Sequence, residues 1–219
     1  MTKKVVIHAY APNRAQAIKQ WFPEAIVKNR YEGEEGDASC DLLILSGGPM
    51  SADASSRAKH QFLEEDFQLL QQLNAHDEKQ PFVLGICLGA QLMTWAFGGT
   101  VAEGEKMLAG WNEIEILSTH PAFDGLVRPL QCEIHYNHIE RLPKDADIVA
   151  TSLCDNVEAF AIGTQFLGVG YHPEVTAEDM SFISKTYGIR FENLCSTTKG
   201  AKEAFEASQR FFENIRSLI

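Results

Sequence analysis

Residues 83–100, VLGICLGAQLMTWAFGGT, are the stretch of sequence that decides the fold. They begin with a short apolar run and end in a segment whose apolar residues recur at helical spacing. Between the two stand Gly85, Cys87 and Gly89. A sharp turn from a strand into a helix needs small residues, because the backbone there is strained and crowded. The pattern therefore predicts a nucleophile elbow that holds Cys87 at the carboxyl end of a sheet, where the helix dipole and a nearby base favour thiolate over thiol.

A second interpretation of the same residues involves no chemistry. A free cysteine is among the most frequently buried residue types, so Cys87 could be a small core residue between two packing glycines. The pattern of glycines around one cysteine does not separate the two interpretations. The remainder of the chain has to decide between them.

The residues before the elbow alternate between buried strands and amphipathic helices. We expect strands at residues 3–10, 25–31 and 41–46, and helices at residues 14–22 and 57–77. This alternation predicts an α/β fold with a mostly parallel central sheet and helices on both faces. In such sheets the chemistry gathers at the carboxyl ends of the strands, where Cys87 and the pair Gly47 and Gly48 are expected to lie.

The second half of the chain has a different pattern. Short strand-like segments follow one another with no long helix between them, at residues 111–117, 130–135, 146–152, 157–162 and 166–171. They predict antiparallel strands that form a small side sheet or extend the main one. Thr176 and Asp179 resemble a capping box at the start of a helix through Ile183. Residues 201–219 predict a final helix packed on the sheet.

Composition limits the classes of function. The 219 residues carry a formal net charge of −11 with no dense cluster of Lys or Arg, so we expect a single domain over residues 1–219 that binds neither nucleic acid nor a membrane. No stretch has the length of a signal-peptide core or a membrane span. The five cysteines are odd in number, widely spaced and without a C-x-x-C pair, so we expect no disulfide framework, no metal, no cofactor and a cytoplasmic location.

A second chemical motif follows the last strand-like segment. His172, Pro173 and Glu174 lie 85 to 87 residues after Cys87. A cysteine nucleophile needs a base to accept its proton, and that base needs a group that fixes its tautomer. Pro173 restricts the backbone between the two side chains, so the segment could present both to one site. A His two residues before a Glu is by itself a common polar loop.

The two motifs together resemble those of the class I, triad-type glutamine amidotransferases. The matching segments are SGGP at residues 46–49, GICLGAQ at 85–91, and VEAFAIG with FLGVGYHPEV within 157–175. They occur in the order of the family and extend over nearly the whole chain. Within the family the chain is most similar to free-standing GMP-synthetase-like amidotransferase domains, through the segments at residues 110–114 and 142–152. The resemblance implies a flavodoxin-like α/β fold.

The resemblance also implies roles for individual catalytic residues. Cys87 resembles the nucleophile that attacks the side-chain amide of glutamine, His172 the base and then the acid, and Glu174 the group that orients His172. The backbone N–H groups of Leu88 and Gly48 resemble the two donors of an oxyanion hole.

Three further residues are implied to hold the substrate. Gln91 matches the family position that helps to hold glutamine, and His135 and Tyr136 belong to the segment aligned with a His-x-Asp segment of the family. Asn137 stands where that Asp is common, which preserves hydrogen bonding but removes a negative charge. Gly170 and Tyr171 stand where many relatives have Gln and Phe, and Gly170 could open space beside the triad.

The other histidines carry less weight. His8 and His138 are interpreted as ordinary polar residues at the surface or at strand ends. The spacing of His135, His138 and His172 does not require a metal.

The leading hypothesis is a cysteine-dependent amidohydrolase that acts on glutamine or a related γ-glutamyl compound through a thioester. The chain has no phosphate-binding loop of the G-x-x-x-x-G-K type, so either a separate synthetase chain accepts the ammonia or the protein hydrolyses its substrate outright. One alternative is a γ-glutamyl peptidase with the same triad. A second is a regulatory or partner-binding module without catalysis. A cysteine-elbow family of deglycases and peptidases shares the architecture but lacks the segment at residues 172–174.

Overall fold

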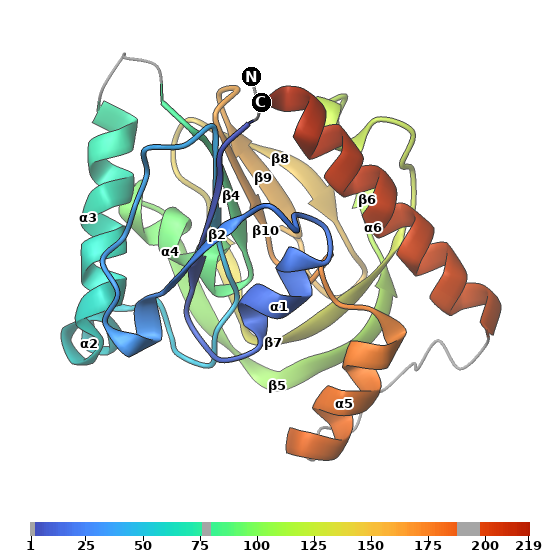
Figure 1. The fold of residues 1–219 in the computed structure, drawn as a ribbon. Helices are drawn as coiled ribbons and strands as arrows, with labels where there is room; N and C mark the ends of the chain where they lie inside the picture. The colour runs from blue at the N-terminus through green and yellow to red at the C-terminus, as the bar shows by residue number, and fades with distance from the viewer. Residues whose placement is uncertain (1–2, 76–79, 188–197) are drawn as a thin grey trace.

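We describe a computed structural model of the chain, which covers residues 3–75, 80–187 and 198–219 (Figure 1). A central sheet of eight strands has the order β2-β1-β3-β4-β10-β9-β8-β6. Its strands are β1 (Val5–Ala9), β2 (Ile26–Asn29), β3 (Leu42–Leu45), β4 (Phe82–Ile86), β6 (Glu115–Ile116), β8 (Ala146–Thr151), β9 (Ala159–Ile162) and β10 (Phe166–Val169). The five strands from β2 to β10 run parallel, and β9, β8 and β6 continue the sheet by antiparallel pairing. The predicted mostly parallel sheet is confirmed.

Helices cover both faces of this sheet, as Figure 1 shows. The helical elements are α1 (Arg14–Lys19), η1 (Arg30–Glu32), α2 (Ala54–Lys59), α3 (Gln61–Ala75), α4 (Leu88–Ala96), η2 (Pro121–Phe123), α5 (Ala177–Tyr187) and α6 (Thr198–Leu218). Val5 and Ile7 of β1 pack in one core cluster with apolar residues of α1 and α6, whereas Val6 packs in another with residues of α3 and α4. Alternate residues of a strand point to opposite faces, so a continuous apolar strand serves two helical layers.

A separate antiparallel ribbon lies at the end of the molecule where the parallel strands finish. It is made of β5 (Thr100–Glu113) and β7 (Leu130–Arg141), with irregular register between Glu103 and Leu108. Apolar residues of the ribbon, Trp111, Cys132 and Ile134, form a small core with Met180 and Ile183 of α5. In Figure 1 the ribbon runs along the lower side of the sheet, so it forms a wall beside the carboxyl ends of β1, β3 and β4.

Four sequence predictions need correction at the level of elements. The sequence places residues 166–171 among the antiparallel strands, but β10 pairs in parallel with β4 and antiparallel with β9. The expected helix at 57–77 is two helices, because His60 leaves the helical conformation between α2 and α3, and its last two positions lie outside the described residues. The strand expected at 111–117 begins at Thr100, with a polar first half whose pattern gives no strand signal. In α6 the buried face includes Ala204 and Phe211, while Phe205 is half exposed.

His8 also differs from expectation, because it is fully buried rather than a surface residue. Its Nδ1 lies 3.0 Å from Oδ2 of Asp66, and its Nε2 accepts a hydrogen bond from the backbone N–H of Asp37. Asp66 also accepts hydrogen bonds from the Tyr10 hydroxyl and from the buried Arg30 guanidinium. The apolar neighbours of His8 in β1 conceal a polar network that joins β1, η1 and α3.

The predicted capping box is present at the start of α5, where the Thr176 N–H and hydroxyl both contact the Asp179 carboxylate. Four of the five cysteines are free thiols, and Cys195 lies outside the described residues. Among the helices that the structure describes, none combines the length and the apolar character needed to cross a membrane.

Candidate active site

Cys87 lies in the turn between β4 and α4 with an unusual backbone conformation. Its φ of 50° and ψ of −104° are costly for a residue with a side chain. The turn is held by hydrogen bonds on both sides: the Cys87 N–H donates to the carbonyl of Val169 at 2.8 Å, and its carbonyl accepts from the Gln91 N–H at 2.9 Å. The sequence prediction of an elbow is therefore matched by the local geometry.

The two glycines of the elbow lie where no side chain fits. A Cβ atom at position 85 would lie 2.8 Å from the backbone nitrogen of Ala90, and one at position 89 would lie 2.3 Å from the carbonyl oxygen of Leu45. Both contacts are far below van der Waals distance and involve backbone atoms, which cannot move aside. The glycines thus let α4 pack directly on β3 and β4 and fix the position of Cys87.

His172 and Glu174 form a buried pair just after β10. Nδ1 of His172 lies 2.8 Å from Oε1 of Glu174, and both side chains are at most 1% exposed. The His172 N–H donates to the carbonyl of Cys132 in β7, and the carbonyl of Glu174 accepts from the side chains of Gln20 and Trp21. The segment is thereby tied to the ribbon on one side and to the region of α1 on the other.

The environment of His172 favours its charged form. Burial by itself would lower the pKa of His172, but the charge of Glu174 and the neighbouring Cys87, each also hydrogen-bonded to the imidazole, raise it to about 9. Nε2, the ring atom remote from Glu174, has no nitrogen or oxygen partner among the described residues. An imidazole held in this way can exchange a proton with the Cys87 thiol.

Gly47 and Gly48 follow β3 and lie against the same site. A Cβ atom at position 47 would lie 2.7 Å from Cε1 of His172 and 3.6 Å from Cβ of Cys87. At position 48 it would lie 2.8 Å from a side-chain carbon of Leu88. The absence of side chains therefore allows the loop after β3 to approach His172 and the first residue of α4.

A cavity of about 590 Å³ opens beside Cys87. Its lining comes from the loop after β3, from α4 and from the ribbon, and includes Gly48, Gln91, His135 and Tyr136. The residues predicted from sequence as catalytic, oxyanion-binding and substrate-binding thus gather around one cavity. Tyr136 is half exposed at its rim, whereas Gln91 and His135 are buried in its wall.

Asn137 takes part in the wall through its backbone and its side chain. Its carbonyl accepts a hydrogen bond from the Gln91 amide at 3.3 Å and lies 3.0 Å from Nδ1 of His135. Its side-chain amide reaches Oγ of Ser51 in the loop after β3, at 3.5 Å. The residue that replaces the family's Asp therefore links the two sides of the cavity.

Gly170 does not lie where the sequence suggests. The sequence predicts that it opens space beside the triad, but its nearest neighbours are atoms of Glu158 and Val157, and its N–H donates to the Glu158 carbonyl at 2.7 Å. The space that it leaves is beside the Glu158 carboxylate. Backbone register, which the sequence does not reveal, decides this difference.

Two buried carboxylates near His135 are not singled out by the sequence analysis. Glu133 in β7 and Glu158 before β9 are both fully buried. Burial and the adjacent Glu133 raise the pKa of Glu158 well above its usual value, because two carboxylates at this distance repel each other. A glutamate within an apolar strand segment, as in CEIH at 132–135 and VEAF at 157–160, is the available signal.

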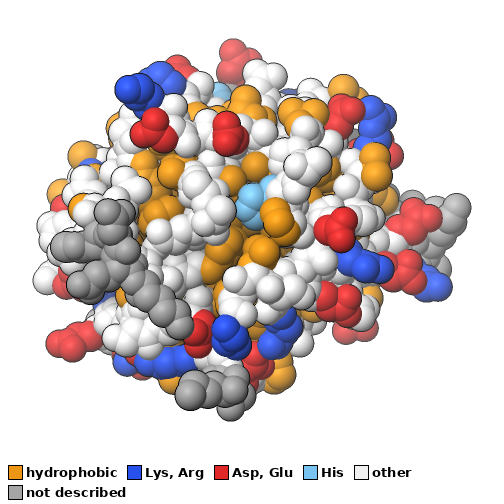
Figure 2. Space-filling view, turned by 90° about the horizontal axis from the view of Figure 1, so that it is seen from above, with side chains coloured by type: hydrophobic (Ala, Val, Ile, Leu, Met, Phe, Trp, Pro, Cys, Tyr) orange, Lys and Arg blue, Asp and Glu red, His pale blue; other side chains and the backbone are white. Residues whose placement is uncertain are grey.

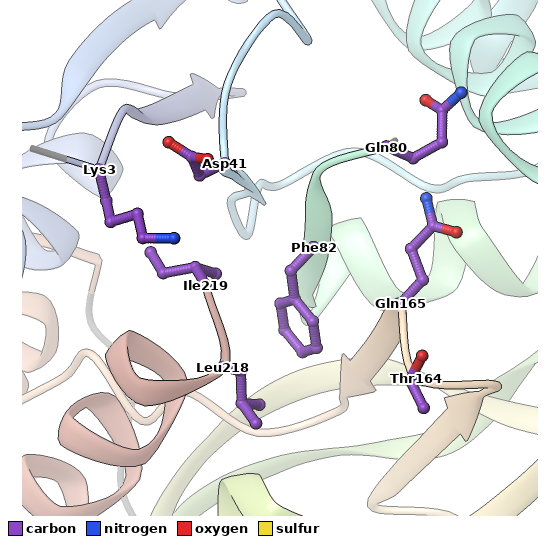
Figure 3. Close-up of a pocket in the computed structure, with 8 residues that line it drawn as sticks. All are labelled: Lys3, Asp41, Gln80, Phe82, Thr164, Gln165, Leu218 and Ile219. Carbon is purple, nitrogen blue, oxygen red and sulfur yellow. The ribbon is translucent and has the colours of Figure 1, made fainter. Parts of the chain in front are cut away.

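A second cavity lies at the opposite end of the sheet. It measures about 330 Å³ and is lined by Lys3, Asp41, Phe82, Gln165 and Leu218, among others (Figure 3). Figure 2 shows this end of the molecule, where side chains of both charges surround a partly hydrophobic centre. None of the residues predicted for the active site lines this cavity, and it lies at the amino ends of the strands.

Comparison with known proteins identifies relatives of the chain. The model of the glutamine amidotransferase class-I family matches residues 3–186. One of the two types of chain named as subunits of the glutamine-hydrolysing GMP synthase is 36% identical over 135 residues in Pyrococcus abyssi and 41% identical over 138 residues in Thermococcus kodakarensis. These matches cover 61% of this chain and 65% of each GMP synthase chain, which is slightly less than two thirds.

Two other relatives extend over more of the chain. Gamma-glutamyl peptidase 4 of Arabidopsis thaliana is 27% identical over 207 residues, which cover 90% of this chain and 80% of the peptidase. The crystal structure of a glutamine amidotransferase from Thermotoga maritima has a TM-score of 0.78 at 22% identity and covers 100% of this chain and 96% of its own. At that identity the structural likeness shows the fold alone.

Proposed function

Because this chain belongs to the glutamine amidotransferase class-I family, we propose that it hydrolyses the side-chain amide of glutamine, or of a related γ-glutamyl compound, through a thioester on Cys87. The observation that carries the proposal is the arrangement of the strained Cys87 turn against the buried pair of His172 and Glu174. A strained turn that presents a thiol beside a paired imidazole is the arrangement that a cysteine nucleophile requires.

The first half of the reaction forms the thioester. His172 takes the proton of the Cys87 thiol, and the sulfur attacks the side-chain carbonyl carbon. Negative charge then develops on the carbonyl oxygen, where the N–H groups of Leu88 and Gly48 act as donors. His172 returns the proton to the leaving nitrogen, the carbon–nitrogen bond breaks, and ammonia departs.

The second half regenerates the enzyme. A water molecule gives a proton to His172 and attacks the thioester carbon. The carbon–sulfur bond breaks, glutamate leaves, and Cys87 recovers its proton from His172. Glu174 accepts a hydrogen bond from Nδ1 of His172 throughout, which fixes the tautomer and stabilises the imidazolium.

Gln91, His135 and Tyr136 are proposed to hold the substrate in the cavity of about 590 Å³. Gln91 and His135 both interact with the carbonyl of Asn137, so the two side chains are oriented by one backbone group. The relatives named as GMP synthase chains support a separate synthetase chain as the acceptor of ammonia.

A γ-glutamyl peptidase is the second candidate, in which the leaving group is an amine larger than ammonia. Two observations favour it. The match with gamma-glutamyl peptidase 4 covers 90% of this chain, against 61% for the two GMP synthase chains. The cavity also extends beyond Cys87 to Glu103, Met107 and Ile183, which leaves room for a larger leaving group.

The test measures ammonia release from glutamine and cleavage of γ-glutamyl peptides by the purified protein. Cys87→Ala should lower both activities about a thousandfold or more, because the nucleophile is lost. Cys154→Ala is the matched control, since this exposed free thiol lies outside the site, and it should retain activity. Full turnover by Cys87→Ala would rule out the thioester. A glutamine-derived electrophile that failed to label Cys87 would favour a non-catalytic module.

The ratio of the two activities separates the candidates. Release of ammonia from glutamine that increases when a synthetase chain is added supports the role of an amidotransferase within a synthetase. Cleavage of γ-glutamyl peptides that exceeds hydrolysis of glutamine supports a peptidase.

A further inference from the structure

Three buried side chains on the far side of His135 form a compact cluster. They are Glu133 and His135 of β7, and Glu158, which directly precedes β9. Their exposed fractions are 0%, 7% and 0%, and one candidate ligand atom from each lies within 4.8 Å of the other two. Neither carboxylate has a part in the proposed hydrolysis.

Each member of the cluster uses one polar atom in a supporting hydrogen bond. Oε2 of Glu133 accepts from the Asn112 amide, and Oε1 of Glu158 accepts from the Ser152 hydroxyl at 2.6 Å. Nδ1 of His135 lies 3.0 Å from the carbonyl of Asn137, which can only accept, so Nδ1 carries the proton and Nε2 has a free lone pair. The supporting bonds hold all three side chains in place.

The second polar atom of each side chain is left without a partner. Oε1 of Glu133, Nε2 of His135 and Oε2 of Glu158 are buried and make no hydrogen bond within the part of the chain that the structure describes. Buried polar atoms without partners cost free energy, and ionised carboxylates cost more unless a positive charge is close. All three atoms are Lewis bases, and a single cation would satisfy them together.

We propose that Glu133, His135 and Glu158 bind one divalent transition-metal ion of the Zn²⁺ type. Two carboxylates and a neutral imidazole neutralise the charge of such an ion, and mixed nitrogen and oxygen ligands suit zinc. A hydrogen bond from the second ring nitrogen of a histidine to a carbonyl, as at His135, is the usual way in which a protein orients a metal-binding imidazole. This inference does not depend on the proposed hydrolysis.

The surroundings provide space and a route of entry. A surface cavity of about 450 Å³ is lined by His135, Tyr136 and Asp155, among others, and so reaches the cluster from outside. A Cβ atom at position 170 would lie 3.4 Å from Oε2 of Glu158, so Gly170 keeps the space beside that ligand atom open.

The site differs from what histidine spacing suggests. The sequence prediction of no metal considers His135, His138 and His172, of which only His135 belongs to the cluster. The two glutamates come from separate strand segments, 25 residues apart, that only the fold brings together. His135 also lines the cavity beside Cys87, so a bound ion would fix the imidazole in that wall.

The test uses the full chain, purified without a histidine tag. After treatment with chelator, Zn²⁺ is titrated by calorimetry, and Co²⁺ is added separately to record its visible absorption spectrum. We expect one Zn²⁺ per chain, a rise in Tm on binding, and a Co²⁺ spectrum typical of nitrogen and oxygen ligands.

Glu158→Gln removes one charged ligand while it preserves shape and hydrogen bonding. It should weaken Zn²⁺ binding about a hundredfold or more and abolish the metal-dependent rise in Tm, while its Tm in chelator stays at or above that of the unaltered protein. The matched control is His138→Gln, which alters a histidine on the same strand outside the cluster and should bind Zn²⁺ normally.

Two results would overturn the proposal. One is an unaltered protein that binds no Zn²⁺ at equimolar concentration, which would leave the carboxylates as a pair that shares a proton only. The other is equal loss of Zn²⁺ binding in His138→Gln and Glu158→Gln, which would indicate adventitious binding to surface histidines.

Discussion

Cys87 carries a conformational cost that its surroundings compensate. A non-glycine residue in this region of φ and ψ costs about 1–3 kcal/mol. The hydrogen bonds to Val169 and Gln91, and the close packing of Gly85 and Gly89, hold the residue there nonetheless. The strain has a direct structural consequence, because it aims the side chain away from the axis of α4 and toward His172.

The first prediction concerns the pH dependence that Glu174 imposes on His172. The pKa of His172 is raised to about 9, so the imidazolium beside Cys87 persists from neutral pH until the pH rises through that value. Glu174→Gln removes a negative charge that stabilises the imidazolium, so the pKa of His172 should fall and the alkaline limb of kcat/KM should move toward neutral pH. The measurement is the pH profile of hydrolysis from pH 6 to about 10.

Glu178→Gln provides the control for this prediction. Glu178 is an exposed carboxylate in the first turn of α5, four residues further along the chain. Its removal should leave the alkaline limb where it is. An unchanged profile in Glu174→Gln would show that Glu174 does not set the charge state of His172.

At the level of elements, the loop after β3 and the segment after β10 approach each other only because position 47 has no side chain. Gly47→Ala places a Cβ 2.7 Å from Cε1 of His172, so the imidazole must rotate away from Cys87. We predict a fall in kcat of about 10²-fold, the size of effect expected for a misplacement of about 1 Å. The folded state should persist, which circular dichroism can check.

A comparison with Gly33→Ala separates stability from catalysis. Gly33 has a φ of 87° and open space around its Cα, so alanine there is strained but clashes with nothing. That variant should lose about 1–2 kcal/mol of stability with kcat preserved. Equal kcat in Gly47→Ala and the unaltered protein would contradict the role assigned to this contact.

The polar network around Asp66 connects three elements and should control stability. Burial acts to raise the pKa of Asp66, but hydrogen bonds from His8 and Tyr10 and the charge of Arg30 lower it. Asp66→Ala leaves the buried Arg30 without its carboxylate partner, so we predict a loss of about 3–5 kcal/mol in the free energy of unfolding, measured with urea. Glu65→Ala, which removes the half-exposed second partner of Arg30, should cost less than about 1 kcal/mol.

The sign of the acid dependence follows from the lowered pKa. An Asp whose pKa is lower in the folded state stabilises the protein above its unfolded value, near 3.9, and that contribution is lost as the pH falls through the folded-state value. The stability difference between Asp66→Ala and the unaltered protein should therefore shrink in acid. A difference that is constant with pH would show that Asp66 acts through packing alone.

At the scale of the whole molecule, the elements that build the site are better predicted from sequence than those that surround it. The apolar runs of β1, β3 and β4 and the glycines of the elbow have local signals, and parallel strands bring their carboxyl ends together without further information. The residues of the segment at 172–174 are assigned to the same site because a cysteine nucleophile needs a base.

The remaining features depend on contacts between distant segments. The direction of β10 is set by its neighbours β4 and β9, and not by its own residues. The burial of His8 follows from Asp66, which lies 58 residues further along the chain. Glu133 and Glu158 are likewise brought together by pairing of separate strands, so their shared environment has no signature within either segment.

The most direct test of the central claim is to trap the acyl intermediate. The protein is mixed with glutamine, quenched in acid within the first turnovers, digested, and analysed by mass spectrometry. We predict a peptide containing Cys87 whose mass is increased by one γ-glutamyl group, which hydroxylamine removes, and no such group in Cys87→Ala. Turnover of glutamine with no γ-glutamyl group on Cys87, or with the group on another residue, would contradict the account.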